Sequence, residues 1–309
     1  MTFKSSLRRG AAIAAAALLG ACGADGTNAA SSVDAAEAGS APAMWRGADE
    51  DTEVFLFGTF HILPKDIEWT TAGFDVAMAA TEHTLTEADV TSPQAQQELN
   101  ELVAQYGLNP PGVTLSDILG PDRAARLAET AEGLGINPAN LESQRPWLAL
   151  LTLAVVAMQK AGYDPASGAE RIVEARAKSE GDDIGYLEDA EVQVKALASL
   201  DADDALANFD AAFEQFEEFA AYTSTMLTAW RTGDVETLDQ AILADLRRDA
   251  PTAFDALIVS RNRAWTRTIN GFLEGEGGYF IAVGAGHLVG EESVLNMLKA
   301  EGWRVERVQ

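Results

Sequence analysis

Two short apolar runs at opposite ends of this 309-residue chain each lead into the same Gly-x-x-His motif. One motif occupies residues 58–61 and the other occupies residues 284–287. Short apolar runs that end at a glycine are typical of buried strands. Because ligands in open α/β sheets bind beyond the carboxyl ends of the strands, the two motifs predict that His61 and His287 reach one shared site.

The chain contains three histidines, and two of them fall in this pattern. A histidine that follows a strand can also close a loop or bond a carbonyl group, so either motif alone is only a hypothesis. Because histidine is a common metal ligand and general base, the two motifs taken together favour a functional site. His83 matches no such motif, and we expect it to be structural.

Residues 1–21 have the pattern of a bacterial lipoprotein signal peptide. Positively charged residues precede the apolar stretch 11–19, which is too short to span a bilayer. Small residues then lead to Cys22, as in signals that are cut before a cysteine that becomes lipidated. An ordinary secretory signal, cut at a small residue, is the alternative. The pattern predicts a periplasmic protein held by a lipid anchor, and Gly23 after the cysteine is compatible with the outer membrane.

Composition limits what the rest of the chain can do. Cys22 is the only cysteine, so no disulfide can form within the chain. Residues 22–43 are mostly small or polar and predict a flexible linker, whereas residues 44–309 predict one folded domain. The formal charge of −26 argues against nucleic acid as a partner and against attraction to anionic lipid. Contact with a membrane is therefore expected through the lipid anchor alone.

Apolar and helical periodicities predict an α/β fold. Strands are expected at residues 53–57, 84–87, 184–187, 279–283 and 304–308. Helices are expected at residues 96–106, 123–134, 146–161, 169–179, 189–200, 203–231, 235–244, 254–273 and 291–300. The aromatic residues along 203–231 predict a core-facing side of that helix and not a cofactor site. We expect a central, mostly buried sheet with its N- and C-terminal strands adjacent, surrounded by many helices and a helical cap.

Several short motifs occur in the order and spacing of one known family. They are Leu-Phe-Gly-Thr-x-His at 56–61, Pro-Trp at 146–147, Leu-Glu at 187–188, Arg-Asn at 261–262 and Gly-Ala-Gly-His-Leu-Val-Gly at 284–290. With these motifs, most of the chain from residue 44 onward resembles the TraB/GumN family, which includes the Tiki-type metalloproteases and is related to erythromycin-esterase-like and ChaN-like proteins. No single motif is specific, so the resemblance depends on their order and spacing.

The resemblance implies four catalytic residues, which are His61, Glu87, Arg261 and His287. The strand before Glu87 is more polar than is usual in the family, so Glu82 remains an alternative as the site carboxylate. In a chain with 48 acidic residues, Glu87 could also be an ordinary solvated acid. Contacts with the substrate are expected from Gly58, Thr59, Glu188, Asn262 and Gly284.

Two imidazoles and one carboxylate can hold a divalent metal ion and leave positions open for water and substrate. We therefore expect His61, Glu87 and His287 to bind a metal such as Mn, Co, Fe or Zn. Such an ion would lower the pKa of bound water and polarise a carbonyl group. Arg261 could then hold a substrate carboxylate or stabilise an oxyanion. Without a metal, the two histidines could act directly as acid and base, as in related esterases.

These expectations predict a metal-dependent hydrolase that cleaves a peptide or amide bond in a peptide or small-molecule substrate. Two alternatives remain open. One is a non-catalytic binding or accessory lipoprotein in polysaccharide export or surface assembly. The other is a metal-free esterase that uses the same histidines.

Overall fold

The computed structural model describes residues 41–202, 206–207, 209–210, 213 and 219–309. The predicted signal peptide, the predicted lipidation site Cys22 and nearly all of the predicted linker lie outside these residues, so these predictions stay predictions. No helix of the described ranges is long and apolar enough to cross a membrane.

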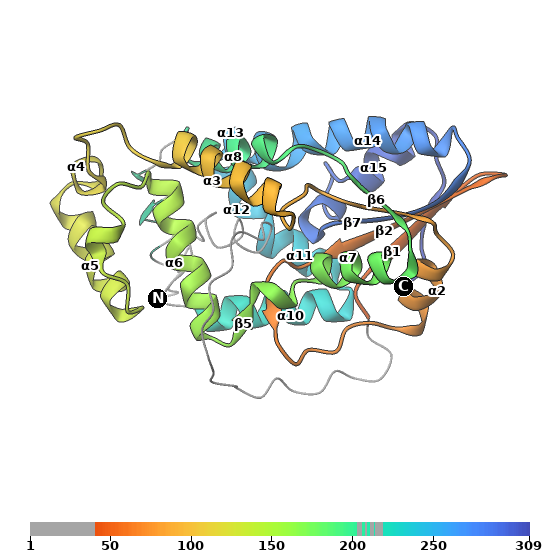
Figure 1. Cartoon of the computed structure of the whole chain (residues 1–309), viewed down its shortest axis with the longest axis horizontal. Helices are drawn as coiled ribbons and strands as arrows, with labels where there is room; N and C mark the ends of the chain where they lie inside the picture. Colours follow the sequence, from red (N-terminus) through yellow and green to blue (C-terminus); the bar gives the residue numbers. More distant parts are fainter. Residues whose placement is uncertain (1–40, 203–205, 208, 211–212, 214–218) are drawn as a thin grey trace, which may run out of the picture.

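A six-stranded mixed sheet forms the centre of the molecule (Figure 1). Its strands in spatial order are β6 (Asp183–Tyr186), β4 (His83–Thr86), β7 (Gly277–Gly284), β2 (Thr52–Thr59), β1 (Met44–Ala48) and β8 (Val305–Arg307). The first four run parallel to one another, and β1 runs antiparallel to both β2 and β8. Strands β2 and β7 pair along their whole length, so strands from the N-terminal and C-terminal parts of the folded domain are adjacent, as predicted.

All five predicted strands are present, but strand β1 was not predicted. Trp45 lies within β1 and pairs with Leu56 of β2. Arg46 and Gly47 interrupt the apolar pattern there, which weakens the strand signal. A short acidic turn at 49–51 then connects β1 to β2 as a hairpin.

Alternate side chains of the central strands face two separate hydrophobic layers. Phe57 of β2 and Phe280 of β7 contact one layer, whereas Leu56 and Ile281 contact the other. All four side chains are at most 1% exposed. This alternation follows from the two-residue period of a strand, and it makes the sheet a buried middle layer, as expected from the apolar runs.

Helices cover both faces of the sheet (Figure 1). On one face, α14 (Ser260–Leu273) and α15 (Val294–Ala300) pack through Trp265, Ile269 and Leu298. On the other face, α2 (Ala72–Ala79) and α7 (Ala169–Glu180) pack through Phe74 and Val173. The α2 helix was not predicted.

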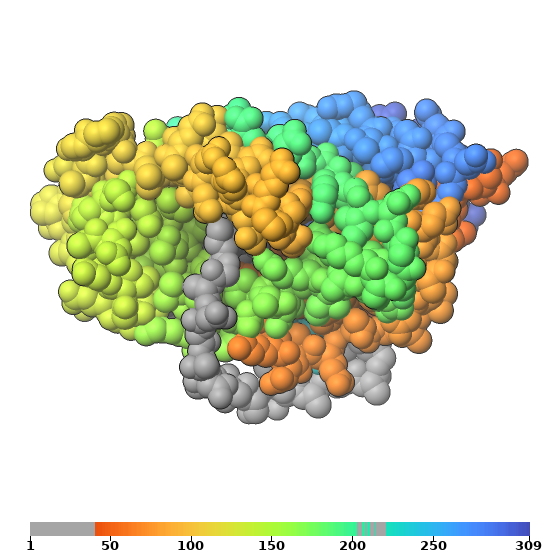
Figure 2. All heavy atoms as spheres, in the orientation of Figure 1, coloured from red at the N-terminus to blue at the C-terminus, as the bar shows by residue number. Residues whose placement is uncertain are grey.

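The predicted helical cap is present beyond the carboxyl ends of the parallel strands. Trp230 of α10 donates from Nε1 to the carbonyl oxygen of Gly58 near the end of β2, at 2.7 Å. Figure 2 shows the region from α4 to α6 at one end of the molecule, opposite the region of α14. The helices outside the sheet layers are α3 (Pro93–Gly107), α4 (Leu115–Leu119), α5 (Pro121–Gly133), α6 (Pro146–Lys160), α8 (Ala190–Ala198), α10 (Phe219–Thr232), α11 (Val235–Ile242), α12 (Ala244–Asp249) and α13 (Pro251–Phe254).

Some predicted helices have different limits. Of the helix expected at 203–231, several residues between 203 and 218 lie outside the described part of the chain, and the rest forms α10. Phe209, Phe213 and Trp230 are buried, which confirms the expected core-facing side. The helix expected at 254–273 contains a π-helical turn, Asp255–Val259, before α14. Helices α4 and α12 were not predicted. A small second sheet pairs β3 (Leu63–Pro64) with β5 (Tyr163–Asp164).

Candidate functional site

Polar side chains follow the carboxyl ends of the four parallel strands. They are His61 after β2, Glu87 after β4, Glu188 after β6 and His287 after β7. Because parallel strands end at one edge of a sheet, residues far apart in the chain converge there. Strands β2 and β7 pair up to Thr59 and Gly284, so the two motif histidines follow neighbouring strand ends.

Arg261 of α14 lies at the centre of this cluster and is buried. Its Nη2 atom donates to Glu87 at 2.6 Å and to Glu188 at 2.7 Å. Its Nη1 atom donates to the carbonyl oxygen of Leu257 at 2.9 Å and lies 3.0 Å from Nε2 of His287. Its Nε atom also donates to Glu188, at 2.9 Å. All five N–H bonds of the guanidinium therefore have acceptors, and Arg261 has no donor left for a substrate.

Burial and neighbouring charges have opposite effects on the pKa of Arg261. Burial alone would lower the pKa of Arg261, but the charges of Glu87 and Glu188 and their hydrogen bonds raise it above its ordinary value. The guanidinium therefore stays charged. Removing one partner from such a buried cluster leaves an uncompensated charge, which strongly destabilises a fold.

His287 is a neutral imidazole with a defined tautomer. Asn262 donates from Nδ2 to the carbonyl oxygen of Glu292 at 2.7 Å, which leaves its Oδ1 atom as the acceptor for Nδ1–H of His287 at 2.6 Å. The Nε2 atom of His287 then carries the lone pair that faces Arg261. Burial, followed by the positive charge of Arg261, lowers the pKa of His287 well below its ordinary value.

Glu87 is 3% exposed and is fixed by three donors. Besides Arg261, they are the backbone N–H of Gly284 at 2.7 Å and Nε2 of Gln193 at 3.0 Å. Glu82 is exposed and lies before β4, at the opposite end of that strand. Of the two carboxylates considered from the sequence, the structure therefore places Glu87 in the cluster, and the interpretation of Glu87 as a solvated acid is wrong.

Glu188 is bonded to Arg261 and is not among the residues that line the cavity described below. It accepts from Arg261 and from Nε1 of Trp265, at 3.0 Å. Burial and the nearby charge of Glu87 raise the pKa of Glu188 above its ordinary value, although Arg261 and Trp265 act to lower it. Glu188 thus holds Arg261 in place.

His61 forms a second polar unit with Glu170, near the start of α7. Nδ1 of His61 lies 2.5 Å from Glu170, whose carboxylate also accepts from the hydroxyl of Thr59. Nε2 of His61 is buried and has no hydrogen-bond partner in the described part of the chain. Burial lowers the pKa of His61, but the charge and hydrogen bond of Glu170 outweigh this effect and raise it above its ordinary value.

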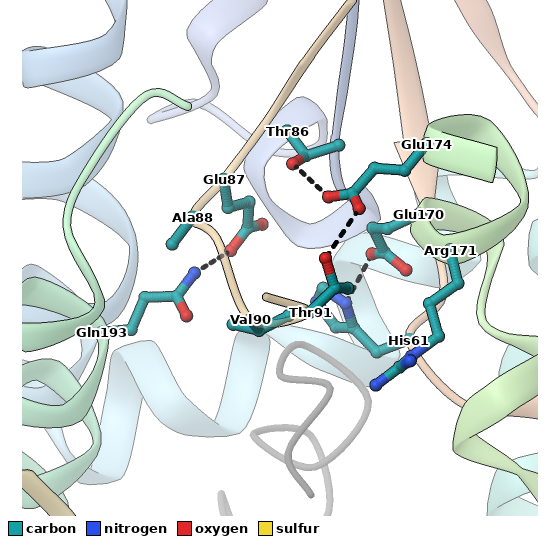
Figure 3. A pocket seen from close by; sticks show the side chains of 10 residues that line it. All are labelled: His61, Thr86, Glu87, Ala88, Val90, Thr91, Glu170, Arg171, Glu174 and Gln193. Atoms are coloured by element: carbon teal, nitrogen blue, oxygen red, sulfur yellow. Dashed lines mark hydrogen bonds and ion pairs between the residues drawn. The ribbon is translucent and has the colours of Figure 1, made fainter. Parts of the chain in front are cut away.

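The His61–Glu170 pair borders a cavity of about 40 Å³ (Figure 3). Glu87 and Gln193 border it from another side, where Figure 3 shows their hydrogen bond. A cavity of this volume can hold water, which needs only roughly 10–15 Å³ of such space. Because its Nε2 atom has no hydrogen-bond partner in the described part of the chain and the residue lines this cavity, His61 is the strongest candidate for direct chemistry. The full lining consists of His61, Thr86, Glu87, Ala88, Val90, Thr91, Glu170, Arg171, Glu174 and Gln193.

The predicted substrate contacts play other roles in this structure. Gly58 packs against the backbone of Ala285, because a Cβ at position 58 would lie 3.2 Å from its Cα. Thr59 binds Glu170, Asn262 orients His287, and Gly284 donates to Glu87. None of these four residues lines the described cavity. Three of them, Thr59, Asn262 and Gly284, position side chains of the polar cluster through hydrogen bonds.

The predicted metal ligands fit a metal ion only in part. The free Nε2 atom of His61, with a carboxylate on Nδ1, matches the arrangement that orients metal-binding histidines. Nε2 of His287 lies 3.8 Å from Oε1 of Glu87, but that oxygen accepts from the backbone N–H of Gly284. Arg261 contacts Nε2 of His287 and donates to Oε2 of Glu87. Within the described ranges, no three His, Cys, Asp or Glu side chains are arranged to hold one ion. Metal binding stays a prediction.

Two residues of this site were missed from the sequence. Glu170 lies in a predicted helix among many other acids, and no local signal distinguishes it. Gly168 precedes α7 and packs against the carbonyl group of His61. Both positions depend on a contact between α7 and the loop after β2, which no pattern within either segment reveals.

The fold and site define an α/β protein with a buried Glu–Arg–Glu cluster and two histidines at the carboxyl edge of its parallel strands. Residues 43–307 match the TraB/PrgY/gumN family, and the chain belongs to that family. The resemblance inferred from the motifs is confirmed.

Individual relatives are distant. Protein YbaP of Escherichia coli K12 is 25% identical over 185 residues, which cover 60% of this chain and 68% of YbaP. A sponge protein named Metalloprotease TIKI homolog, from Amphimedon queenslandica, is 32% identical over 84 residues, 26% of this chain and 14% of the relative. No solved structure matches this chain significantly.

Proposed function

We propose that this chain is a hydrolase of peptide or amide bonds and that His61 is its general base. The observation that carries this proposal is the His61–Glu170 pair. The ring is buried and oriented through Nδ1, its Nε2 atom has no hydrogen-bond partner in the described part of the chain, and His61 lines a cavity large enough for water. A general base needs such a lone pair within hydrogen-bond reach of the proton that it removes.

The chemical steps follow from this arrangement. Nε2 of His61 takes a proton from water while the water oxygen attacks the substrate carbonyl carbon. Glu170 stabilises the imidazolium that forms, because its carboxylate already bonds Nδ1. The imidazolium then returns the proton to the amine nitrogen as the C–N bond breaks, which leaves a carboxylic acid and a free amine.

The Arg261 cluster has a positioning role in this proposal. It holds Glu87 at the cavity wall and keeps His287 neutral beside it. The cluster also acts on His61, because the charge of Glu87 raises the pKa of His61 and the charge of Arg261 lowers it.

Metal-dependent hydrolysis is the second candidate. It is favoured by the carboxylate-bound His61 and by the name of the sponge relative, which matches about a quarter of this chain. His61 would hold a divalent ion such as Mn, Co, Fe or Zn, and Glu87 and His287 could join only after releasing Arg261. A bound ion would supply Lewis-acid activation of water and carbonyl group.

We also propose that the domain works on the periplasmic side of a bacterial membrane. The support is the signal-like segment 1–21 and the cysteine that follows it. Lipidation of Cys22 would anchor the chain without a spanning helix. A palmitate label that is lost in Cys22→Ala would test this proposal.

The catalytic proposal is tested with the full chain purified in detergent. Hydrolysis of a short peptide library and of chromogenic esters is measured for the wild type, His61→Ala and Glu170→Gln. His83→Ala is the matched control. His83 is the first residue of β4, at the end of the strand away from the site, and its ring stacks on Tyr279 with the ring centroids 4.9 Å apart. We expect His61→Ala to lose roughly 100-fold or more of kcat/KM and His83→Ala to retain it.

Metal content and chelation separate the candidates. Activity that persists in chelator supports direct catalysis by His61. Stoichiometric divalent metal that is lost in His61→Ala, together with inhibition by chelator, supports the metal-dependent form. If the wild type hydrolyses nothing in the library, the hydrolase proposal is wrong and a binding or accessory protein remains.

A further inference from the structure

Arg171 differs from every other side chain that lines the cavity (Figure 3). Among the described residues that line the cavity it is the only arginine or lysine, and it is half-buried. Arg171 directly follows Glu170 in α7, so the guanidinium is carried on the same helical turn as the carboxylate that orients His61. Figure 3 shows its side chain extending to the side of the pocket where His61 lies.

The acids of the cavity are already occupied by other donors. Glu87 accepts from Arg261, Gln193 and a backbone N–H. Glu170 accepts from His61 and Thr59. The third carboxylate, Glu174, accepts from the hydroxyls of Thr86 at 3.1 Å and Thr91 at 3.3 Å and lies 3.6 Å from the ammonium group of Lys178.

No hydrogen bond or ion pair joins the Arg171 guanidinium to another described residue. The chain has 48 acidic residues and only 22 basic ones, so carboxylate partners are abundant. A cation that borders a cavity without such a partner has its donors available to a ligand. Because a guanidinium matches the planar fork of a carboxylate, a carboxylate is the ligand that it binds best in a peptide-type substrate.

We propose that Arg171 binds a carboxylate group of the substrate, so that the site prefers peptides with a free carboxylate near the scissile bond. This inference rests on the proposed function of the same site. Arg261 was expected from the sequence to bind such a group, but all of its donors are occupied. The cavity volume of about 40 Å³ admits only a few atoms, which suits the end of a substrate.

The test uses pairs of short N-acetylated peptides that differ only in one carboxylate. In the first pair, N-acetyl-trialanine is compared with its C-terminal amide. In the second pair, a C-terminally amidated peptide carries glutamate or glutamine in its middle position. Affinities are measured by calorimetry, and kcat and KM by product analysis, on the full chain in detergent.

For the wild type we expect a preference of roughly 10- to 100-fold for the acid of one pair, which is typical of a hydrogen-bonded charge. The pair that shows it identifies a terminal or side-chain carboxylate. Arg171→Ala should lose the preference through KM, with kcat little changed, and Arg171→Lys should retain part of it. The matched control is Arg267→Ala, which removes an exposed arginine of α14 outside the cavity lining.

The outcomes distinguish this inference from the proposed function. An acid preference in binding without any hydrolysis supports the role of Arg171 and overturns the hydrolase proposal. Hydrolysis with the same acid-to-amide ratio in the wild type and Arg171→Ala supports the hydrolase and overturns the role of Arg171. If neither member of either pair binds, the role of Arg171 is overturned as well.

Discussion

Gly168 lies directly against the backbone of His61. A Cβ atom at position 168 would be 2.2 Å from the carbonyl oxygen of His61, far inside any real contact. The φ angle of Gly168 is −54°, which any residue can adopt. Close approach and not backbone conformation therefore requires glycine here, and it allows α7 to bring Glu170 to His61.

We expect Gly168→Ala to shift the loop that carries His61. The overpacked contact should lower the free energy of unfolding by about 1–3 kcal/mol and reduce activity, because His61 and Glu170 separate. Urea denaturation and kcat/KM measure the two effects. Gly133→Ala at the end of α5 is the control, since no atom lies within 4 Å of its added Cβ. Equal effects of the two substitutions would contradict the contact.

Glu170→Gln should alter the pH dependence of catalysis. Glu170 raises the pKa of His61 by charge and hydrogen bonding, against the lowering effect of burial. A general base must be neutral, so wild-type kcat/KM should rise with pH through a pKa above the ordinary histidine value. Removing the charge lowers this pKa, so the acidic limb of the profile should move to lower pH.

The maximum of the Glu170→Gln profile should fall on the order of 100-fold, because the imidazolium loses its partner. An unchanged acidic limb would show that another group titrates. Asp66→Asn, at an exposed position, controls for the loss of one negative charge.

Arg261→Met should strongly destabilise the fold. It leaves the buried carboxylates of Glu87 and Glu188 without their cation, which costs about 3–5 kcal/mol. The loss should grow as pH rises, since burial already raises the pKa of Glu188 and protonation relieves the unpaired charge at low pH. Urea unfolding at pH 5.5 and pH 8 measures this difference.

A second substitution tests whether unpaired buried charge causes the destabilisation of Arg261→Met. Glu188→Gln added to Arg261→Met should recover part of the stability at pH 8, because one of the two buried charges is removed. Arg267→Met on the exposed side of α14 should change stability by less than about 0.5 kcal/mol. No recovery in the double variant would contradict the charge argument.

Asp201→Asn should stabilise the protein above pH 6 and have little effect below pH 4. Burial raises the pKa of Asp201 from 3.8 to about 6, more than its hydrogen bond from the backbone N–H of Trp147 lowers it. Between these pH values the folded chain holds a proton that the unfolded chain releases, so this group lowers the free energy of unfolding as pH rises.

The expected gain at pH 8 is on the order of 1–2 kcal/mol, since asparagine can still accept from Trp147 and no buried charge remains. Thermal unfolding of wild type and variant from pH 4 to pH 8 measures it. A gain that does not depend on pH would exclude titration of Asp201 as the cause.

Local patterns were sufficient for much of the fold. The apolar runs that became β2 and β7 are recognisable because each is short, continuous and ended by a polar motif, and the helices around α7 and α14 follow from periodicity. Strand β1 was missed because Arg46 and Gly47 break its pattern, although pairing with β2 and β8 stabilises it. Strand pairing supplies hydrogen bonds that the sequence of one strand does not reveal.

Which residues stand at the carboxyl ends of the strands can be predicted from local patterns, because strand ends are a local property of composition and spacing. Which charges meet depends on the packing of distant segments. Arg261 binds a glutamate 174 positions away, and Thr59 donates to a glutamate 111 positions away. An excess of acids offered many partners for each cation, and only the packing of α7 and α14 on opposite faces of the sheet selected Glu170 for His61, and Glu87 and Glu188 for Arg261.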